Sequence, residues 1–147
     1  MTPIQYTIQV DLSASKESIW QAITQFDAYP KWNTVLSMAG NDSLEIGKKF
    51  HVTIYGGKTD SKFTATTLSS KADESFAAQQ KIVGKWFFSA THHFIIEASG
   101  EGARFIQHWE LTGIISRVFR KDIFKQLELF KRMNHELKMY LEPSRTR

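Results

Sequence analysis

The stretch that decides the fold runs from Gly113 to Leu141 and reads GIISRVFRKDIFKQLELFKRMNHELKMYL. Apolar side chains recur in it at spacings of three and four residues, which is the period of one helical face. No Pro or Gly interrupts the run, and Pro143 ends it because proline disfavours helix in the residue before it. The stretch therefore predicts one amphipathic helix of about seven to eight turns. Its apolar face, with Asn134 as the one polar member, comprises Ile115, Phe119, Ile123, Leu127, Phe130, Asn134, Leu137 and Leu141.

The opposite face of this helix is basic. A helix this apolar on one side needs a partner surface, and the usual partner is the core of its own protein. A membrane surface and a calmodulin-like partner are the alternatives. Basic residues outnumber acidic ones on this face. The acidic residues are Asp122, Glu128 and Glu136, and the basic residues are Arg117, Arg120, Lys121, Lys125, Lys131, Arg132 and Lys138.

Composition narrows the class of protein. A length of 147 residues with 41% hydrophobic residues predicts a single domain, 1–147, with its own core. Aromatic residues reach 13%, which favours large rigid walls around a core or a pocket. The chain has no Cys, so disulfides, thiol catalysis and zinc–thiolate sites are excluded. No apolar run approaches the roughly 18 residues of a membrane span, and the N-terminus lacks the pattern of a signal peptide. We therefore expect a cytoplasmic protein.

Upstream of the helix, the pattern changes from strand to helix and back to strand. Residues 6–12 alternate as a half-buried strand, Ser15 begins a helix, and Asp27 to Trp32 forms a second short helix or turn. From Thr34 to Thr112, alternating segments separated by Gly turns predict about six antiparallel strands. The expected fold is α+β: a curved antiparallel sheet wrapped around the long C-terminal helix, with space between them for a ligand.

Several short motifs occur in an order that resembles the START-like, or SRPBCC, superfamily of helix-grip proteins. The nearest resemblance is to small bacterial members described as polyketide cyclase/dehydrase-like. It implies a helix-grip fold with a hydrophobic cavity for lipids, polyketides, aromatic metabolites or hormones. It does not imply one reaction, because the superfamily includes carriers, cyclases, oxygenase subunits and chaperone-type co-activators. The motifs are Ser15…Ile19-Trp20, Tyr29-Pro30-Lys31-Trp32-Asn33, Gly47, His92-x-Phe94-x-Ile96-Glu97, Leu111-Thr112-Gly113 and Phe130…Met133-Asn134…Leu137-Lys138.

His92 is the one candidate for acid–base chemistry. Its parity with Phe94 and Ile96 points it into the cavity, where it is either a general acid or base or a histidine hydrogen-bonded at the cavity edge. Many relatives carry a polar or acidic residue where this chain has Trp109, and that departure disfavours cyclase or dehydratase chemistry. A register shift of one residue would instead turn His108 and Glu110 inward as an acid–base pair.

The ligand-binding residues predicted from these patterns are aromatic walls, helix residues and three polar side chains. His92, Gln107 and Asn134 would orient polar ligand atoms, although Asn134 could equally bond a local backbone group. The full set is Trp32, Trp86, Phe88, His92, Phe94, Gln107, Trp109, Phe119, Ile123, Leu127, Phe130 and Asn134.

The favoured function is non-catalytic binding of a hydrophobic small molecule such as a lipid, a polyketide or an aromatic metabolite. One alternative is a cyclase- or dehydratase-type enzyme that uses His92, and another is a chaperone-activator-like interaction protein. We expect no cofactor, no metal site and no nucleic-acid partner, because no spacing of ligands or phosphate-binding loop is found. Monomer and homodimer both stay open, and the sequence does not name the ligand.

Overall fold

The computed structural model describes residues 2–84 and 86–142. Over these residues the strands form one seven-stranded antiparallel sheet in the order β1-β7-β6-β5-β4-β3-β2. The strands are β1 (Ile4–Leu12), β2 (Leu36–Ala39), β3 (Lys49–Ile54), β4 (Ser61–Lys71), β5 (Ser75–Ile82), β6 (Phe88–Ser99) and β7 (Gly102–Thr112). The helices are α1 (Lys16–Thr24), the 3₁₀-helix η1 (Phe26–Lys31), α2 (Ile114–Val118), α3 (Arg120–Leu127) and α4 (Phe130–Leu141).

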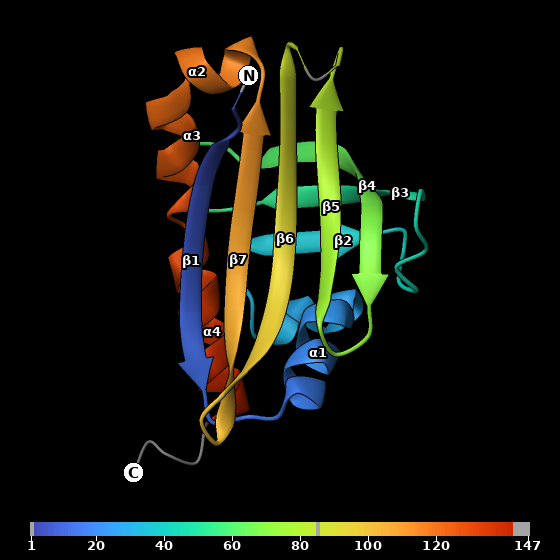
Figure 1. Ribbon diagram of the computed structural model, residues 1–147, viewed down its shortest axis with the longest axis vertical. Helices are drawn as coiled ribbons and strands as arrows, with labels where there is room; N and C mark the ends of the chain where they lie inside the picture. The colour runs from blue at the N-terminus through green and yellow to red at the C-terminus, as the bar shows by residue number, and fades with distance from the viewer. Residues whose placement is uncertain (1, 85, 143–147) are drawn as a thin grey trace.

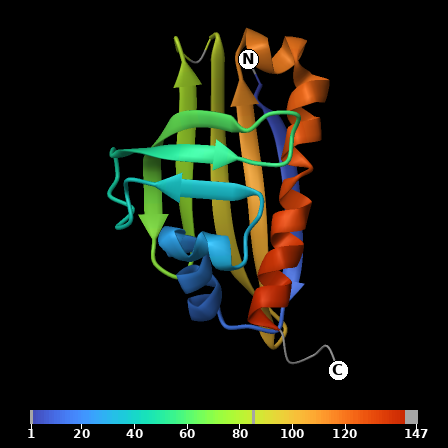
Figure 2. The same ribbon diagram turned by 180° about the vertical axis from the view of Figure 1, so that it is seen from behind.

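The sheet curls around the C-terminal helices, as the sequence predicts. Strands β2 and β3 cross behind β6 and β7 in Figure 1 and in front of them in Figure 2, and α3 and α4 run alongside β1 and β7 on the concave side. Helices α1 and η1 lie below β2 at one end of the concave side (Figure 2). The α+β helix-grip architecture predicted from the sequence is confirmed.

The start of α1 follows from one side chain. The Oγ of Ser15 accepts a hydrogen bond from the Ser18 N–H at 3.1 Å, and Ser15 has extended dihedral angles. A serine in this position satisfies one of the N–H groups that the first helical turn leaves unpaired. The predicted helix start at Ser15 is thus confirmed.

The pairing of β1, β7 and β6 fixes which side chains enter the core. Trp109 of β7 lies opposite Tyr6 of β1 and His92 of β6. Since side chains alternate along a strand, His108 and Glu110 must then face outward. The alternative register that would turn these two residues inward does not occur.

The C-terminal helix differs from the prediction of one uninterrupted helix. It is divided at Phe119, whose φ of −106° and ψ of 27° are not helical, and again at Glu128 and Leu129, where hydrogen bonds span three residues instead of four. The second break coincides with a tight contact, because a Cβ added to Gly56 would lie 2.8 Å from Arg132 Nη2 and 3.5 Å from Leu129 Cδ2. Periodicity alone carries no trace of such a tertiary contact. The expected stop at Pro143 lies outside the described residues; α4 ends at Leu141.

Gly113, which precedes α2, supports a first prediction. Its φ is +98°, and an added Cβ would lie 2.4 Å from the Phe87 carbonyl oxygen. We expect Gly113→Ala to lower the free energy of unfolding by about 3 kcal/mol, because both the backbone conformation and the space exclude a side chain. Urea unfolding followed by circular dichroism measures this loss.

The matched control for this change is Gly47→Ala. Gly47 also has a positive φ, +87°, but nothing lies within 4 Å of its added Cβ. We expect it to cost about 1 kcal/mol from backbone strain alone. Equal losses for the two variants would show that the contact with Phe87 contributes nothing.

Candidate functional site

A cavity of about 100 Å³ lies between the concave face of the sheet and the C-terminal helices. Strand β6 contributes Phe88, His92 and Phe94 to its wall, and β7 contributes Trp109. From the helices come Ile123, Leu127 and Phe130. Seven of the side chains that the sequence predicts for the ligand site therefore lie around one space.

His92 is held rigidly in this wall by aromatic rings. Its imidazole stacks on Trp109 at a ring distance of 4.2 Å and on Phe94 at 3.9 Å. Phe130 approaches it edge-on at 5.3 Å. Packing on three sides fixes the plane of the imidazole, so its two nitrogens have fixed directions.

A chain of buried amides meets one of these nitrogens. His92 Nε2 lies 2.8 Å from Gln107 Oε1, and Gln107 Nε2 donates to Asn134 Oδ1 at 2.7 Å. The same Gln107 nitrogen lies 3.8 Å from Met133 Sδ, a weak acceptor. Gln107 is fully buried, so each of its polar atoms needs a partner. Gln107 and Asn134 thus form a buried link from the sheet to α4 behind the cavity wall.

This link decides the tautomer of His92. Met133 Sδ can only accept a hydrogen bond, so its position 3.8 Å away favours the amide nitrogen of Gln107 on that side and the amide oxygen toward His92. His92 Nε2 then donates, and Nδ1 carries the unshared electron pair. Among the described residues Nδ1 makes no hydrogen bond, and it is not among the polar atoms that are sealed from solvent without a partner. His92 Nδ1 is therefore a fixed hydrogen-bond acceptor in a largely apolar wall, whose other polar side chains are Gln80 and Gln126.

Burial also sets the charge of this residue. It lowers the pKa of His92 from 6.5 to about 3, although the hydrogen bond with Gln107 acts in the opposite direction. His92 is therefore neutral at physiological pH. No other side chain of the cavity wall is titratable in the part of the chain that the structure describes. A base with so low a pKa removes protons poorly at pH 7, whereas its lone pair still accepts a hydrogen bond.

Five predicted residues lie away from the cavity wall. Trp32 is buried against Tyr140 of α4, with ring centres 6.0 Å apart. Trp86 and Phe119 are exposed beside α2: the Trp86 carbonyl oxygen accepts from the Ile114 N–H at the start of α2, and Phe119 follows the end of α2. Gln107 and Asn134 sit behind the wall, and Asn134 borders a groove between β1 and α4 instead. Direct ligand contact by these five residues is not supported by their positions.

The opposite wall of the cavity comes from strands for which the sequence indicates only burial. Its residues are Leu36 and Met38 of β2, Val52 and Ile54 of β3, and Ala65 of β4. The alternation of Val52 and Ile54 marks them as inward-facing, but only the curl of the sheet brings them across from β6. Gln126 of α3 also borders the space, and its Nε2 donates to Ser61 Oγ at 2.7 Å.

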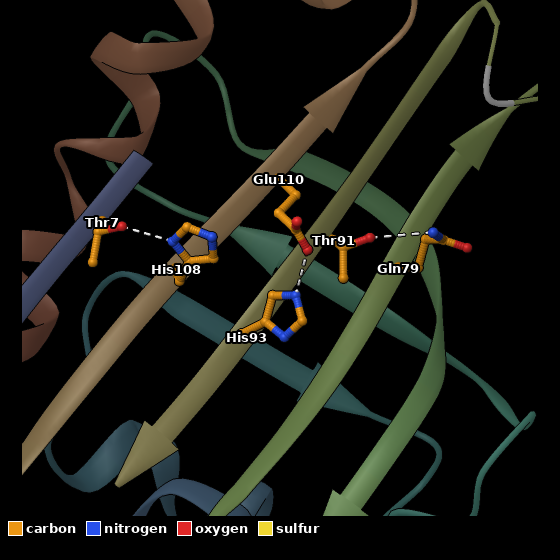
Figure 3. A network of polar contacts seen from close by, with 6 residues as sticks. All are labelled: Thr7, Gln79, Thr91, His93, His108 and Glu110. Carbon is orange, nitrogen blue, oxygen red and sulfur yellow. Dashed lines mark hydrogen bonds and ion pairs between the residues drawn. The ribbon is translucent and has the colours of Figure 1, made fainter. Parts of the chain in front are cut away.

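His93 of β6 and His108 and Glu110 of β7 lie on the outer face of the sheet. His93 Nε2 bonds Glu110 Oε1 at 2.9 Å, and His108 Nδ1 bonds the Thr7 hydroxyl at 2.6 Å (Figure 3). These pairs join β6 to β7 and β7 to β1 on the side away from the cavity. No three His, Asp or Glu side chains within residues 2–84 and 86–142 are grouped so that they could hold a metal ion.

The pKa of His92 generates a prediction about stability against pH. The folded protein holds this imidazole neutral, so the unfolded chain binds one more proton between pH 6.5 and about 3. The contribution of neutral His92 to the free energy of unfolding is fully present above pH 6.5. It is lost as the pH falls, by up to about 1.4 kcal/mol per pH unit. We expect His92→Gln to flatten the pH dependence of urea unfolding between pH 6.5 and 4.

The control for this experiment is His51→Gln, because His51 is exposed on β3. Its slope of stability against pH serves as the reference for the loss of a histidine outside the cavity. A His92→Gln variant with the slope of the unchanged protein would show that folding does not shift the pKa of His92.

Known proteins resemble this chain in structure but not in sequence. No protein-family profile matches the sequence, and no curated protein matches it closely enough to count as a relative. The structure is similar to protein MLL2253 from Mesorhizobium loti, with a TM-score of 0.70 at 12% identity over 98% of this chain and 99% of that one.

Two structures of enzymes are also similar. One is norcoclaurine synthase from Thalictrum flavum in complex with dopamine and hydroxybenzaldehyde, with a TM-score of 0.66, 11% identity, and 95% and 87% of the two chains covered. The other is the di-domain ARO/CYC StfQ from the steffimycin biosynthetic pathway, with a TM-score of 0.74 and 11% identity over 98% of this chain and 52% of that one. At such identities the likeness shows the fold alone. The chain shares the helix-grip fold of these structures.

Proposed function

We propose that this protein binds a small hydrophobic molecule bearing a hydrogen-bond donor, such as a phenol, in the cavity between the sheet and the C-terminal helices. The observation that carries the proposal is His92 Nδ1, which has no hydrogen-bond partner among the described residues and lies in a wall with Phe94, Trp109 and Phe130. An apolar wall favours a ring by removing its surface from water, and a fixed acceptor orients one polar atom.

The size of the cavity limits the ligand. A volume of about 100 Å³ is below the roughly 150 Å³ of an engineered apolar cavity that binds benzene. A single ring therefore requires a small outward movement of the wall, and a lipid or polyketide requires a large one. The ligand proposed here is accordingly at the small end of the classes that the sequence predicts.

Helix α3 is the wall that can move at least cost. Leu127 is its one fully buried residue, whereas α4 buries Phe130, Met133, Asn134 and Leu137. Both ends of α3 are breaks in the helical pattern, and Gln126 joins it to β4 through Ser61. Displacing α3 would widen the cavity without breaking the buried link between Gln107 and Asn134.

Binding without catalysis accounts for the site better than acid–base chemistry does. A cyclase or dehydratase needs groups that give and take protons near pH 7. The low pKa of His92 and the position of His93, His108 and Glu110 on the outer face leave the cavity without such a pair. The similarity to norcoclaurine synthase and StfQ keeps an enzyme as the second candidate, with His92 Nδ1 as its base. The cytoplasmic location stays a prediction.

A comparison of toluene with phenol tests the proposal. In a purely apolar cavity toluene binds more tightly, because phenol loses hydrogen bonds to water on entry. We expect the unchanged protein to bind phenol at least as tightly as toluene, and His92→Phe to shift the ratio of the two dissociation constants toward toluene by roughly tenfold. Ligand-observed NMR titration measures both constants.

Ala78→Leu serves as a second variant, since Ala78 is buried in the cavity wall on β5. Filling the space should weaken both ligands together, whereas Ala98→Leu, at an exposed site near the end of β6, should weaken neither. Failure of the unchanged protein to bind either ring would contradict the binding function. If His92→Phe left the ratio of the toluene and phenol dissociation constants unchanged, this would contradict the role of Nδ1 but not the binding function.

A further inference from the structure

Large apolar side chains are exposed together at one end of the molecule. Val83 is 77% exposed, Trp86 64% and Val118 67%. Soluble proteins scatter single exposed apolar residues over their surface, but a contiguous group marks an interaction site. We call this group the apolar tip; it consists of Ile82, Val83, Trp86, Ile114, Val118 and Phe119.

Two segments that are distant in sequence build the apolar tip. The Ile114 N–H donates to the Trp86 carbonyl oxygen at 3.0 Å, which joins the start of α2 to the turn after β5. Ile82 pairs with Phe88 across the β5–β6 hairpin, and Val118 lies one helical turn after Ile114. The end of β5, the start of β6 and α2 lie at the same end of the molecule (Figure 1; Figure 2).

Val83 of the apolar tip has an unusual backbone conformation. Its φ of +67° lies in the left-handed region, which β-branched residues rarely occupy. Neither local conformation nor burial favours valine here, because Asn or Gly would fit the backbone better and a polar side chain would suit water. Val83 is therefore neither buried nor in a favourable backbone conformation, and its apolar surface is presented outward.

The charged residues beside the apolar tip are mainly cationic. Arg120 and Lys121 follow Phe119 directly and are exposed, and Lys81 precedes Ile82 on β5. Asp122 is the acidic residue of α2 and α3, whose cationic residues are Arg117, Arg120, Lys121 and Lys125. A cationic rim around apolar side chains is complementary to a surface that combines negative charge with an apolar interior.

We propose that the apolar tip docks on an anionic lipid bilayer, with Val83, Trp86 and Val118 entering the interface and the cationic rim contacting lipid phosphates. Trp is suited to this depth because its ring is apolar and its N–H is polar. Each Lys or Arg near an anionic surface adds to the attraction. A second copy of the chain fits less well, since a symmetric pairing of two tips would bring the two cationic rims together.

The tip and the cavity are close along the chain. Phe88, which lines the cavity, lies two residues after Trp86, and Ile123, also in the wall, lies four residues after Phe119. The docking proposal does not depend on the ligand proposal, because vesicle binding requires no occupant in the cavity.

Vesicle sedimentation tests the docking proposal. The probes are phosphatidylcholine vesicles with and without one third phosphatidylglycerol. We expect the protein to sediment with the anionic vesicles, and Val118→Asp to lower its partition coefficient by about tenfold or more. Ile46→Asp is the matched control, since Ile46 is 65% exposed and lies in the loop between β2 and β3.

Two further variants separate loss of docking from loss of folding. Val83→Asn should keep or raise the thermal midpoint, because Asn tolerates a positive φ, and still weaken vesicle binding several-fold. Arg120→Glu with Lys121→Glu should remove the preference for anionic over neutral vesicles. Brominated lipids should quench Trp86 in the unchanged protein, and the quenching should be absent in Trp86→Phe.

Three outcomes would overturn the proposal. The first is a protein that does not sediment with anionic vesicles at millimolar lipid. The second is equal loss of binding in Val118→Asp and Ile46→Asp. The third is a dimer by analytical ultracentrifugation that Val118→Asp converts to a monomer, because the tip would then be an interface between copies of the chain.

Discussion

The buried amide of Gln107 is the interaction on which the arrangement of sheet and helix depends. It lies in the middle of β7, accepts from His92 of β6 and donates to Asn134 of α4. An unpaired amide in this position would cost roughly 1–3 kcal/mol, so a helix shifted by one turn against the sheet is penalised. Apolar packing alone tolerates such a shift more readily, since one Leu or Phe replaces another with little change.

The same amide gives the cavity its chemical character. By facing His92 with its oxygen, Gln107 leaves the Nδ1 lone pair for the cavity. Trp109 and Phe94 hold the ring so that this direction does not change. A histidine without the amide would choose between two tautomers, and the cavity would then present a donor as readily as an acceptor. The specificity proposed for the site is therefore set by a residue that does not touch the ligand space.

Much of the fold could be predicted because its signals are local. Alternation in β6 and β7 indicates which side chains face inward, and Ser15 marks the start of α1 by the hydrogen bond it can make. The parity of His92 and Trp109 was sufficient to predict that both face the same side. The outward positions of His93, His108 and Glu110 follow from the same alternation once the register is known.

The features that escaped prediction are those that depend on contacts between distant segments. The break at Leu129 occurs among good helix formers, and Gly56 of the β3–β4 loop is packed against it. Gln107 and Asn134 lie on separate elements, so the sequence around either residue does not indicate that the two side chains pair. The wall formed by Leu36, Val52 and Ala65 requires the curl of the sheet. Trp86 was predicted as a cavity wall from its aromaticity, but the hairpin turn places it outside.

The distribution of burial along the C-terminal segment connects the cavity with the apolar tip. Helix α4 is anchored by four buried residues, α3 by Leu127 and α2 by Ser116, so anchoring decreases toward the tip. A segment with few buried contacts opens at a low free energy, and its opening does not require the rest of the fold to unfold. If α2 docks on a bilayer as proposed, the free energy of docking favours movement of α2 and α3, the helices that cost least to displace. The wall at Ile123 would then be displaced while Gln107 and Asn134 keep the acceptor of His92 in place. A protein built in this way separates a fixed element that recognises the ligand from a loosely held one that admits it.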